Sequence, residues 1–388
     1  MRILIVDIGT GTQDIYLYNS QLDMENNFKL VVPSPTMIVR QQIKQATLHR
    51  EAILLSGVTM GGGPSTWAAD DHLQAGLAIY ATPDAARTFN DDLSKVKEMG
   101  IIVVSEDEAK LLPDSTRRLS IKDFDFQSIS RAFQSFGISL ADLDAIAVGV
   151  FDHGNAPANV SDRQFRFDYL DERIRKLNRL SAFAYRAEDV PASMTRMQCV
   201  VDSAGEVDCP LVVMDTAPAA VLGATLDPSV AAREHVIISN IGNFHTLAFR
   251  IGKNGVEGLF EHHTGFLDRG KLERLLRALG NGSIRREEVF DDQGHGALIY
   301  DPTPLIFGKG DFDVVITGPR RSLFPPGSQD DGAAFLRPFY PAPFGDMMIT
   351  GCFGILAAVA DVMPELSEPI HGSLKPGSKV GTAPWDVE

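Results

Sequence analysis

The chain has 388 residues, of which 44% are hydrophobic and 22% are charged, and its formal net charge is −15. This length exceeds what one hydrophobic core usually supports, so two domains are expected, and the composition excludes a disordered chain. The negative charge argues against nucleic acid and against anionic membrane surfaces as partners, because both are negative themselves.

The cysteines and the apolar runs indicate where the protein works. Cys199, Cys209 and Cys352 do not have the spacing of a disulfide framework, a zinc site or an iron–sulfur motif. The sequence shows neither a secretory signal nor an apolar run long enough to span a bilayer. We therefore expect a cytoplasmic protein in a reducing compartment.

Residues 3–18, ILIVDIGTGTQDIYLY, predict a strand, a glycine-rich turn and a returning strand. Gly9 and Gly11 permit backbone angles that other residues resist. The N–H groups of such a turn, with the hydroxyls of Thr10 and Thr12, can surround a phosphate, and Asp7 beside it could hold a hydrated Mg²⁺. An ordinary N-terminal hairpin explains the same residues equally well.

The next segments alternate between strand and helix patterns. Strands are expected over 28–32, 52–58, 101–105 and 145–150, and helices over 37–50, with Thr36 as cap, and 65–80. Residues 61–63 are three glycines, which we interpret as a flexible strand-to-helix turn. This alternation predicts an α/β fold.

The loop over 151–159 follows a predicted strand, where α/β proteins place ligands. Asp152 and His153 could contact a substrate or a metal there, although a hydrogen-bonded loop is the simpler interpretation. After a strand over 211–214, Asp215 precedes a run of small residues that lets a helix approach another element closely. Asp215 could be a catalytic base or only the helix cap, and we place the domain boundary at this point.

A second hairpin is expected from a strand over 235–239 and a return over 247–251. Its turn begins Asn240-Ile241-Gly242, which matches Asp7-Ile8-Gly9 of the first hairpin. Two similar hairpins far apart in sequence suggest two related domains that face each other. The adjacent His262 and His263 would point to opposite faces of a strand, so they would chelate a metal poorly.

The C-terminal third continues the pattern. We expect a helix over 271–279, strands over 314–317 and 347–350, a loop over 327–332 and a helix over 355–361. After Pro364 the tail is rich in Pro, Gly and Ser, and is expected to run over the surface.

The order of these elements resembles the actin, sugar-kinase and heat-shock-chaperone ATPase superfamily. Five segments are similar to its motifs: residues 7–14 and 240–246 to the two phosphate loops, 215–224 and 349–360 to the two connecting helices, and 314–321 to the adenosine strand. The resemblance implies two ribonuclease-H-like (actin-like ATPase) domains, here 1–215 and 216–388, with ATP and Mg²⁺ in the cleft between them. The sequence departs from the pattern at Asn240, usually Asp, and at Gly318-Pro319, usually richer in glycine.

Within this superfamily, the whole sequence is similar to a prokaryotic family labelled pyruvate formate-lyase activating enzyme. The label implies radical chemistry on an iron–sulfur cluster. The three scattered cysteines cannot supply the usual cluster motif, so we reject the label on chemical grounds.

The resemblance implies an ATP-dependent phosphotransferase or ATPase that acts on an unknown small-molecule acceptor. Asp7 would hold Mg²⁺, Asp215 would be the base, and Asp152 and His153 would contact the acceptor. The nucleotide would be bound by Gly9, Thr10, Gly11, Thr12, Gln13, Gly242, Asn243, Thr246 and Gly318. On this interpretation, Asp215→Asn would lower turnover and leave the melting temperature nearly unchanged.

Two other classes of function stay open. A nucleotide sensor would bind ATP without turning it over, as Asn240 and the weak adenosine turn slightly favour. A structural metal-binding protein would use His153, His245, His262 and His263. Whether the chain forms a homodimer is also open.

Overall fold

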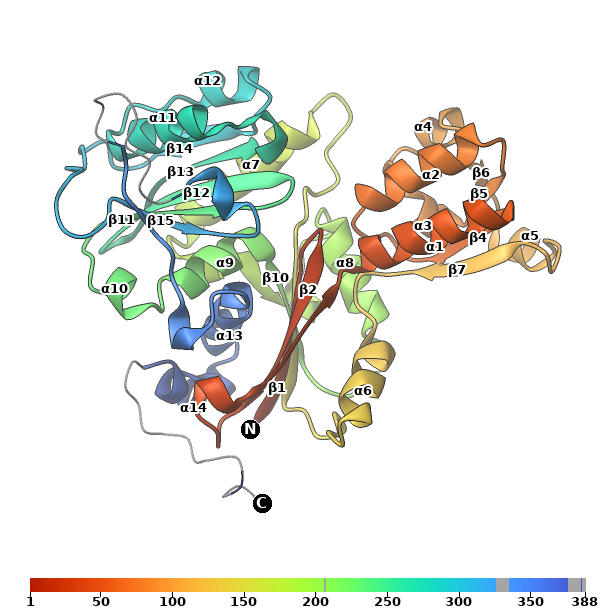
Figure 1. Ribbon diagram of the computed structural model, residues 1–388, viewed down its shortest axis with the longest axis horizontal. Coiled ribbons are helices and arrows are strands. Elements are labelled where there is room, and N and C mark those ends of the chain that lie inside the picture. Colours follow the sequence, from red (N-terminus) through yellow and green to blue (C-terminus); the bar gives the residue numbers. More distant parts are fainter. Residues whose placement is uncertain (206, 326–334, 376–384, 386–388) are drawn as a thin grey trace.

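The computed structural model describes residues 1–205, 207–325, 335–375 and 385. It is an α/β structure with three sheets (Figure 1). The loop predicted over 327–332, and the end of the tail predicted to run over the surface, lie outside the described residues.

The first sheet has the strand order β3-β2-β1-β8-β10-β9. Its first three strands form an antiparallel meander, β8 and β10 continue it in parallel with β1, and β9 is an antiparallel edge. The bounds are Arg2–Ile8 for β1, Thr12–Asn19 for β2, Phe28–Pro33 for β3, Ala145–Val150 for β8, Ala184–Arg186 for β9 and Leu211–Asp215 for β10. β8 is buried along its whole length, as expected for an apolar strand covered on both faces.

The second sheet repeats this arrangement with the order β14-β13-β12-β11-β15-β16. As in the first sheet, the strand that comes first in the chain, β11, has neighbours of two kinds. On one side it joins an antiparallel meander through β12 and β13, and on the other it pairs with the parallel strand β15. The bounds are Val236–Ile241 for β11, His245–Gly252 for β12, Gly255–His263 for β13, Gly296–Ile299 for β14, Val314–Thr317 for β15 and Pro338–Phe339 for β16. The two hairpins predicted from the sequence are β1–β2 and β11–β12.

The third sheet is wholly parallel, with the order β6-β5-β4-β7, and lies between β3 and β8 in the chain. Its strands are β4 (Ile53–Gly57), β5 (Ile79–Ala81), β6 (Ile102–Val103) and β7 (Arg117–Ile121). Its helices are α1 (Pro35–His49), α2 (Pro64–Gln74), α3 (Pro83–Ala86), α4 (Leu93–Glu98) and α5 (Glu106–Lys110). This unit has its own hydrophobic core and projects to the right in Figure 1.

Two helices join the first and second sheets. α9 (Thr216–Ala224) packs against strands of both sheets, and α13 (Thr350–Val362) packs against α9 and the first sheet. A Cβ atom on Gly223 would overlap the carbonyl of Thr350, and one on Gly354 would overlap the carbonyl of Ala219. The close helix approach predicted from the small residues is therefore confirmed.

The other helices cover the sheets or connect them. They are α6 (Phe126–Ser135), α7 (Asp162–Lys176), α8 (Thr195–Ser203), α10 (Pro228–Ala231), α11 (Arg269–Gly280), α12 (Arg286–Asp291) and α14 (Pro364–Leu374). None of the helices in the described part of the chain has the length and hydrophobicity that crossing a bilayer requires.

Four local predictions were wrong. Ser34, not Thr36, caps α1, because its hydroxyl accepts from Met37 N. The helix expected over 65–80 ends at Gln74 and gives way to β5. Residues 347–350 are a turn and the first residue of α13, where the carboxylate of Asp346 accepts from Met348 N. The segment after Pro364 does not simply run over the surface, because it begins as a helix, α14, in which Ile370 and Leu374 are buried.

Candidate functional site

A cavity of about 620 Å³ lies where the three sheets meet. The segments that line it include the turn after β1, the turn after β11, the glycine loop over 61–63 and residues 151–154, which follow β8. This volume is typical of small-molecule sites. The cavity therefore brings together both hairpin turns that the sequence singled out.

The two turns share one hydrogen-bonding pattern. Gly9 N–H donates to the carbonyl of Thr12 at 2.9 Å, and Gly242 N–H donates to the carbonyl of His245, also at 2.9 Å. The turns face each other, because a Cβ atom on Gly11 would lie 3.1 Å from the side-chain amide nitrogen of Asn243.

Asp7 lies at the end of β1 on the wall of this cavity. Its carboxylate is closely flanked by two glycines: a Cβ atom on Gly149 would lie 2.8 Å from Oδ1, and one on Gly351 would overlap Oδ2. Thr216 Oγ1 donates to Oδ1 at 2.5 Å. Burial, and next the charge of Asp14, raise the pKa of Asp7 to about 7. Burial also raises the pKa of Asp14, to about 6. A bound cation would offset the repulsion between these carboxylates.

Asp215 lies behind the cavity wall and is fully buried. Its Oδ1 accepts from Ala217 N at 3.1 Å, which makes it the N-cap of α9, as one interpretation of the sequence expected. Its Oδ2 is ion-paired with Arg166, a fully buried residue of α7 that also contacts Glu261 at 3.3 Å. Asp215 is thus part of a buried charge network. An asparagine there would leave Arg166 short of a partner. The structure therefore predicts a lower melting temperature for this variant, where the sequence alone predicted one nearly unchanged.

The structure brings most, though not all, of the predicted nucleotide residues to the cavity. Those that line it are Gly9, Thr10, Gly11, Thr12, Gly242, Asn243 and Gly318. Gln13 and Thr246 do not: the amide of Gln13 donates to the carbonyl of Pro33, and the buried hydroxyl of Thr246 bonds that of Thr264 at 2.9 Å. Gly318 has φ of 98°, where a Cβ atom would lie 2.5 Å from both Asn240 Oδ1 and Ile241 O, so this position requires glycine.

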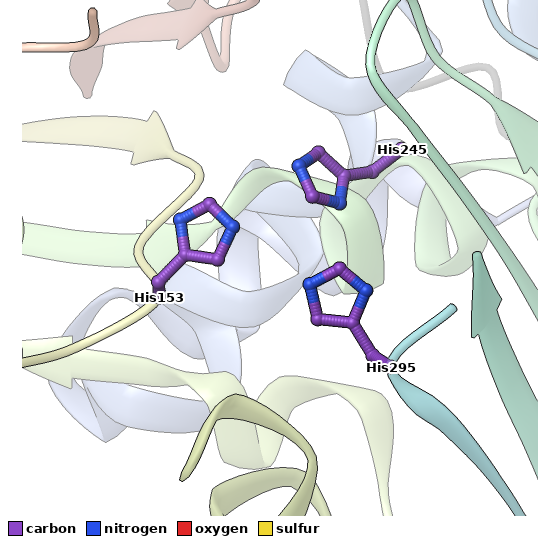
Figure 2. Close-up of side chains that lie close together, drawn as sticks. All are labelled: His153, His245 and His295. Carbon is purple, nitrogen blue, oxygen red and sulfur yellow. The ribbon is translucent and has the colours of Figure 1, made fainter. Parts of the chain in front are cut away.

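The two residues predicted to contact a substrate or a metal, Asp152 and His153, have different roles in the structure. Asp152 is buried and accepts from Gly154 N at 2.8 Å and from Met197 N at 2.9 Å, so its carboxylate organises the loop. His153 points towards two other histidines, His245 and His295 (Figure 2). The ligating nitrogens of these three rings lie within 4.8 Å of one another.

His295 was missed by sequence reasoning. It lies in the polar turn before β14, far along the chain from His153, and no local spacing connects the two. Burial is the largest cause of the low pKa values of three histidines here: the pKa of His153 lies well below its usual value, that of His295 is lowered to about 3, and that of His263 to about 4. These rings are therefore neutral at pH 7. His262 and His263 point apart as expected, since His262 is fully buried and His263 lines the cavity.

The third sheet contributes one wall of the cavity. Trp67 of α2 packs edge-on against Phe244 of the second turn, with ring centroids 5.6 Å apart. Arg196 of α8 is ion-paired with Asp123 at 2.7 Å and donates to the carbonyl of Phe151 at 2.6 Å. These contacts hold the unit formed by the third sheet against the end of β8 and the second turn.

Comparisons with known proteins give one family match. The family described as "Putative pyruvate format-lyase activating enzyme (DUF1786)" matches residues 60–323, which is more than half of the chain. No sequence among the curated proteins is significantly similar to the chain.

Three solved structures match with low similarity. The ROK hexokinase from Thermus thermophilus is 12% identical, with 66% of this chain and 48% of that chain covered and a TM-score of 0.24. An exopolyphosphatase-like protein is 9% identical, with 82% and 65% covered and a TM-score of 0.22. An acetone carboxylase in its nucleotide-free form is 11% identical, with 66% and 45% covered and a TM-score of 0.19. The chain spans about half the length of the hexokinase, and we draw no conclusion from matches at these TM-scores.

Proposed function

The chain belongs to the DUF1786 family, and we propose that it is an ATP-dependent phosphotransferase or ATPase rather than the activating enzyme of the family's description. An activating enzyme needs a cysteine-ligated iron–sulfur cluster. The described residues bring no set of three cysteines together, and Cys352 is buried in the core beside α9. These residues do not fit such a cluster.

One observation carries the proposal: two hairpin turns with the same hydrogen bond face each other across a single cavity. The N–H groups of glycine-rich turns bind phosphate oxygens, and a pair of such turns can hold a polyphosphate from both sides. The turn after β1 would take one side of the phosphates, and the turn after β11 the other.

We further propose that the first and second sheets are two ribonuclease-H-like halves, with a boundary after Asp215. Their strand orders match in the meander and in the parallel strand next to it. On this proposal the third sheet is an insertion in the N-terminal half, 1–215, and the C-terminal half is 216–388.

Mg²⁺ would be held near Asp7. Burial, and next the charge of Asp14 on the neighbouring strand, raise the pKa of this carboxyl to about 7, and a cation bound beside it would offset both effects. When bound, Mg²⁺ would neutralise phosphate charge. In this chain, Thr216 orients Asp7 through its hydrogen bond, and the lack of side chains on Gly149 and Gly351 leaves room for the carboxylate, which lines the cavity.

The acceptor would lie beside His153, on the part of the cavity wall formed by the end of β8. The role of Asp215 as general base stays a prediction, because its carboxylate is buried and ion-paired. Non-catalytic nucleotide sensing is the second candidate. Nucleotide sensing is favoured by Asn240, which occupies the same position on β11 that Asp7 occupies on β1. The second turn therefore offers no carboxylate at that position.

The test is a thermal-shift titration with Mg·ATP. A ligand that binds only the folded state raises its melting temperature. Gly9→Val and Gly242→Val should each abolish the shift, because a Cβ atom would press on Thr12 O at 3.2 Å or on His245 O at 2.6 Å. Gly372→Val is the matched control, since the space around Gly372 is open in the described structure.

Phosphate release separates the two candidate functions. An ATPase or phosphotransferase releases or transfers phosphate, whereas a sensor gives the thermal shift with little turnover. A full ATP shift in both glycine variants would refute the model with two phosphate-binding turns.

A further inference from the structure

We propose that His153, His245 and His295 bind one divalent first-row transition-metal ion, at a site separate from the Mg²⁺ position at Asp7. The three rings come from different parts of the fold: the end of β8, the start of β12 and the turn before β14. Figure 2 shows them converging on a common space from three directions. Their ligating nitrogens lie within 4.8 Å of one another, close enough to share an ion.

The unsatisfied polar atoms of the cluster point independently to a ligand. His295 is fully buried, yet neither of its ring nitrogens has a hydrogen-bond partner among the described residues. A buried polar group without a partner destabilises the folded state, so native structures rarely keep one without a reason. A metal ion would bind the ring nitrogen of His295 that carries the lone pair.

Glu261 provides the charge that such an ion needs. It is fully buried on β13, and its Oε2 contacts Arg166 at 3.3 Å. Its Oε1 lies 3.1 Å from Nδ1 of His245 and 3.8 Å from Nε2 of His295, and forms no hydrogen bond within the described structure. A carboxylate next to a metal-binding histidine commonly orients the ring or becomes a further ligand.

The ligand chemistry selects the class of metal. Imidazole nitrogens suit Zn²⁺, Fe²⁺ and Co²⁺, whereas Mg²⁺ prefers oxygen ligands. His153 and His245 line the cavity while His295 lies behind them, so the ion would have one side open to the cavity. Three histidines with an open position are typical of catalytic rather than structural zinc sites. We infer that the open position would take an oxygen of the acceptor or a water.

The alternative is a purely structural stack of rings. Phe151 stacks on His245 with centroids 4.3 Å apart, and His153 stacks on His295 at 5.8 Å. Substituting a flat apolar ring separates the two explanations. His295→Phe and His153→Phe keep a ring in the stack and remove the ligand atoms.

The experiment uses the full chain, stripped with a chelator and then titrated with Zn²⁺ by calorimetry, with elemental analysis of the stoichiometry. We expect one Zn²⁺ per chain. Bound Co²⁺ should show the visible absorption of an ion with a low coordination number. Each Phe variant should weaken Zn²⁺ binding by more than the roughly 10–100-fold that loss of an outer-shell partner causes. His371→Asn, an exposed residue of α14, is the control and should bind like the parent.

Two results would overturn the proposal. One is a parent protein that binds no stoichiometric Zn²⁺ or Co²⁺. The other is a pair of Phe variants that bind as tightly as His371→Asn. The metal-free melting temperature of His295→Phe should stay near that of the parent, which shows that the variant is folded.

This site does not depend on the proposed ATP function. Gly9→Val should lose the Mg·ATP shift and keep Zn²⁺ binding. Failure of the nucleotide proposal would thus leave the metal proposal standing, and the reverse also holds.

Discussion

Asp7, the penultimate residue of β1, lies in surroundings that disfavour a negative charge, and this has a consequence for stability. Its pKa is about 7 in the folded chain against an ordinary value of 3.8, so the folded state binds this proton more tightly than the unfolded state. The contribution of Asp7 to stability is therefore complete below pH 3.8 and is lost as the pH rises towards 7.

We predict that Asp7→Asn changes this pH dependence. In metal-free buffer, the melting temperature of the parent should fall relative to that of the variant between pH 4 and pH 7, since asparagine carries no titrating proton. Calorimetric scans at a series of pH values measure the difference. Curves that stay parallel across this range would show that Asp7 titrates normally.

Asp215 leads to a prediction of another kind, because its carboxylate balances Arg166 in the interior. Asp215→Asn keeps the cap of α9 but removes this charge, and breaking a buried ion pair costs about 3–5 kcal/mol. Chemical denaturation should show that loss. Asp107→Asn is the control: it breaks an exposed pair with Lys110, which should cost less than about 1 kcal/mol.

The same variant tests the predicted base. At a temperature where Asp215→Asn is folded, a general base would lower turnover by about a hundredfold to ten-thousandfold. Turnover within about twofold of the parent would leave Asp215 as a cap and ion-pair partner only.

At the scale of elements, the two hairpins could be predicted because their signals are local. Apolar strands, glycines at the turns and alternating returns all lie within about twenty residues. The sequence could not show that the strands of the third sheet form a sheet of their own. Its strands and helices alternate as in any α/β unit, and alternation does not say to which sheet a strand belongs.

The strand expected over 347–350 shows the limit of short apolar runs. Met347, Met348 and Ile349 are apolar, yet Asp346 turns the chain just before α13. A run of this length fits a strand or the approach to a helix equally well, and only the packing of α13 on α9 decides between them.

The sequence predicted the parts of the candidate site that are formed by backbone groups of the turns. The positions of Gly9, Gly11 and Gly242 follow from turn chemistry, so the part of the cavity wall that the two turns form could be expected. The histidine cluster depends on long-range packing, which brings His295 against His153 and has no local signature. The burial of Asp215 likewise depends on Arg166, which approaches from α7.

At the scale of the whole molecule, three sheets contribute to one cavity, and the third meets the second through Trp67 and Phe244. Gly63, just before α2, approaches the ring of Phe244 so closely that a Cβ atom on Gly63 would lie 2.6 Å from that ring. A ligand that enters between the turns would therefore change the surroundings of Trp67, which is 57% exposed and lines the cavity.

This contact gives the protein an intrinsic fluorescent probe. The chain has two tryptophans, and the other, Trp385, is 85% exposed. In a Trp385→Phe background, Mg·ATP should shift or quench the emission of Trp67, and the Gly242→Val substitution should remove the response. Emission that stays constant while the melting temperature rises would place the nucleotide away from Phe244. Titration of this single emitter would report ligand affinity without any label, and stopped-flow traces would follow ligand binding beside Phe244 in real time.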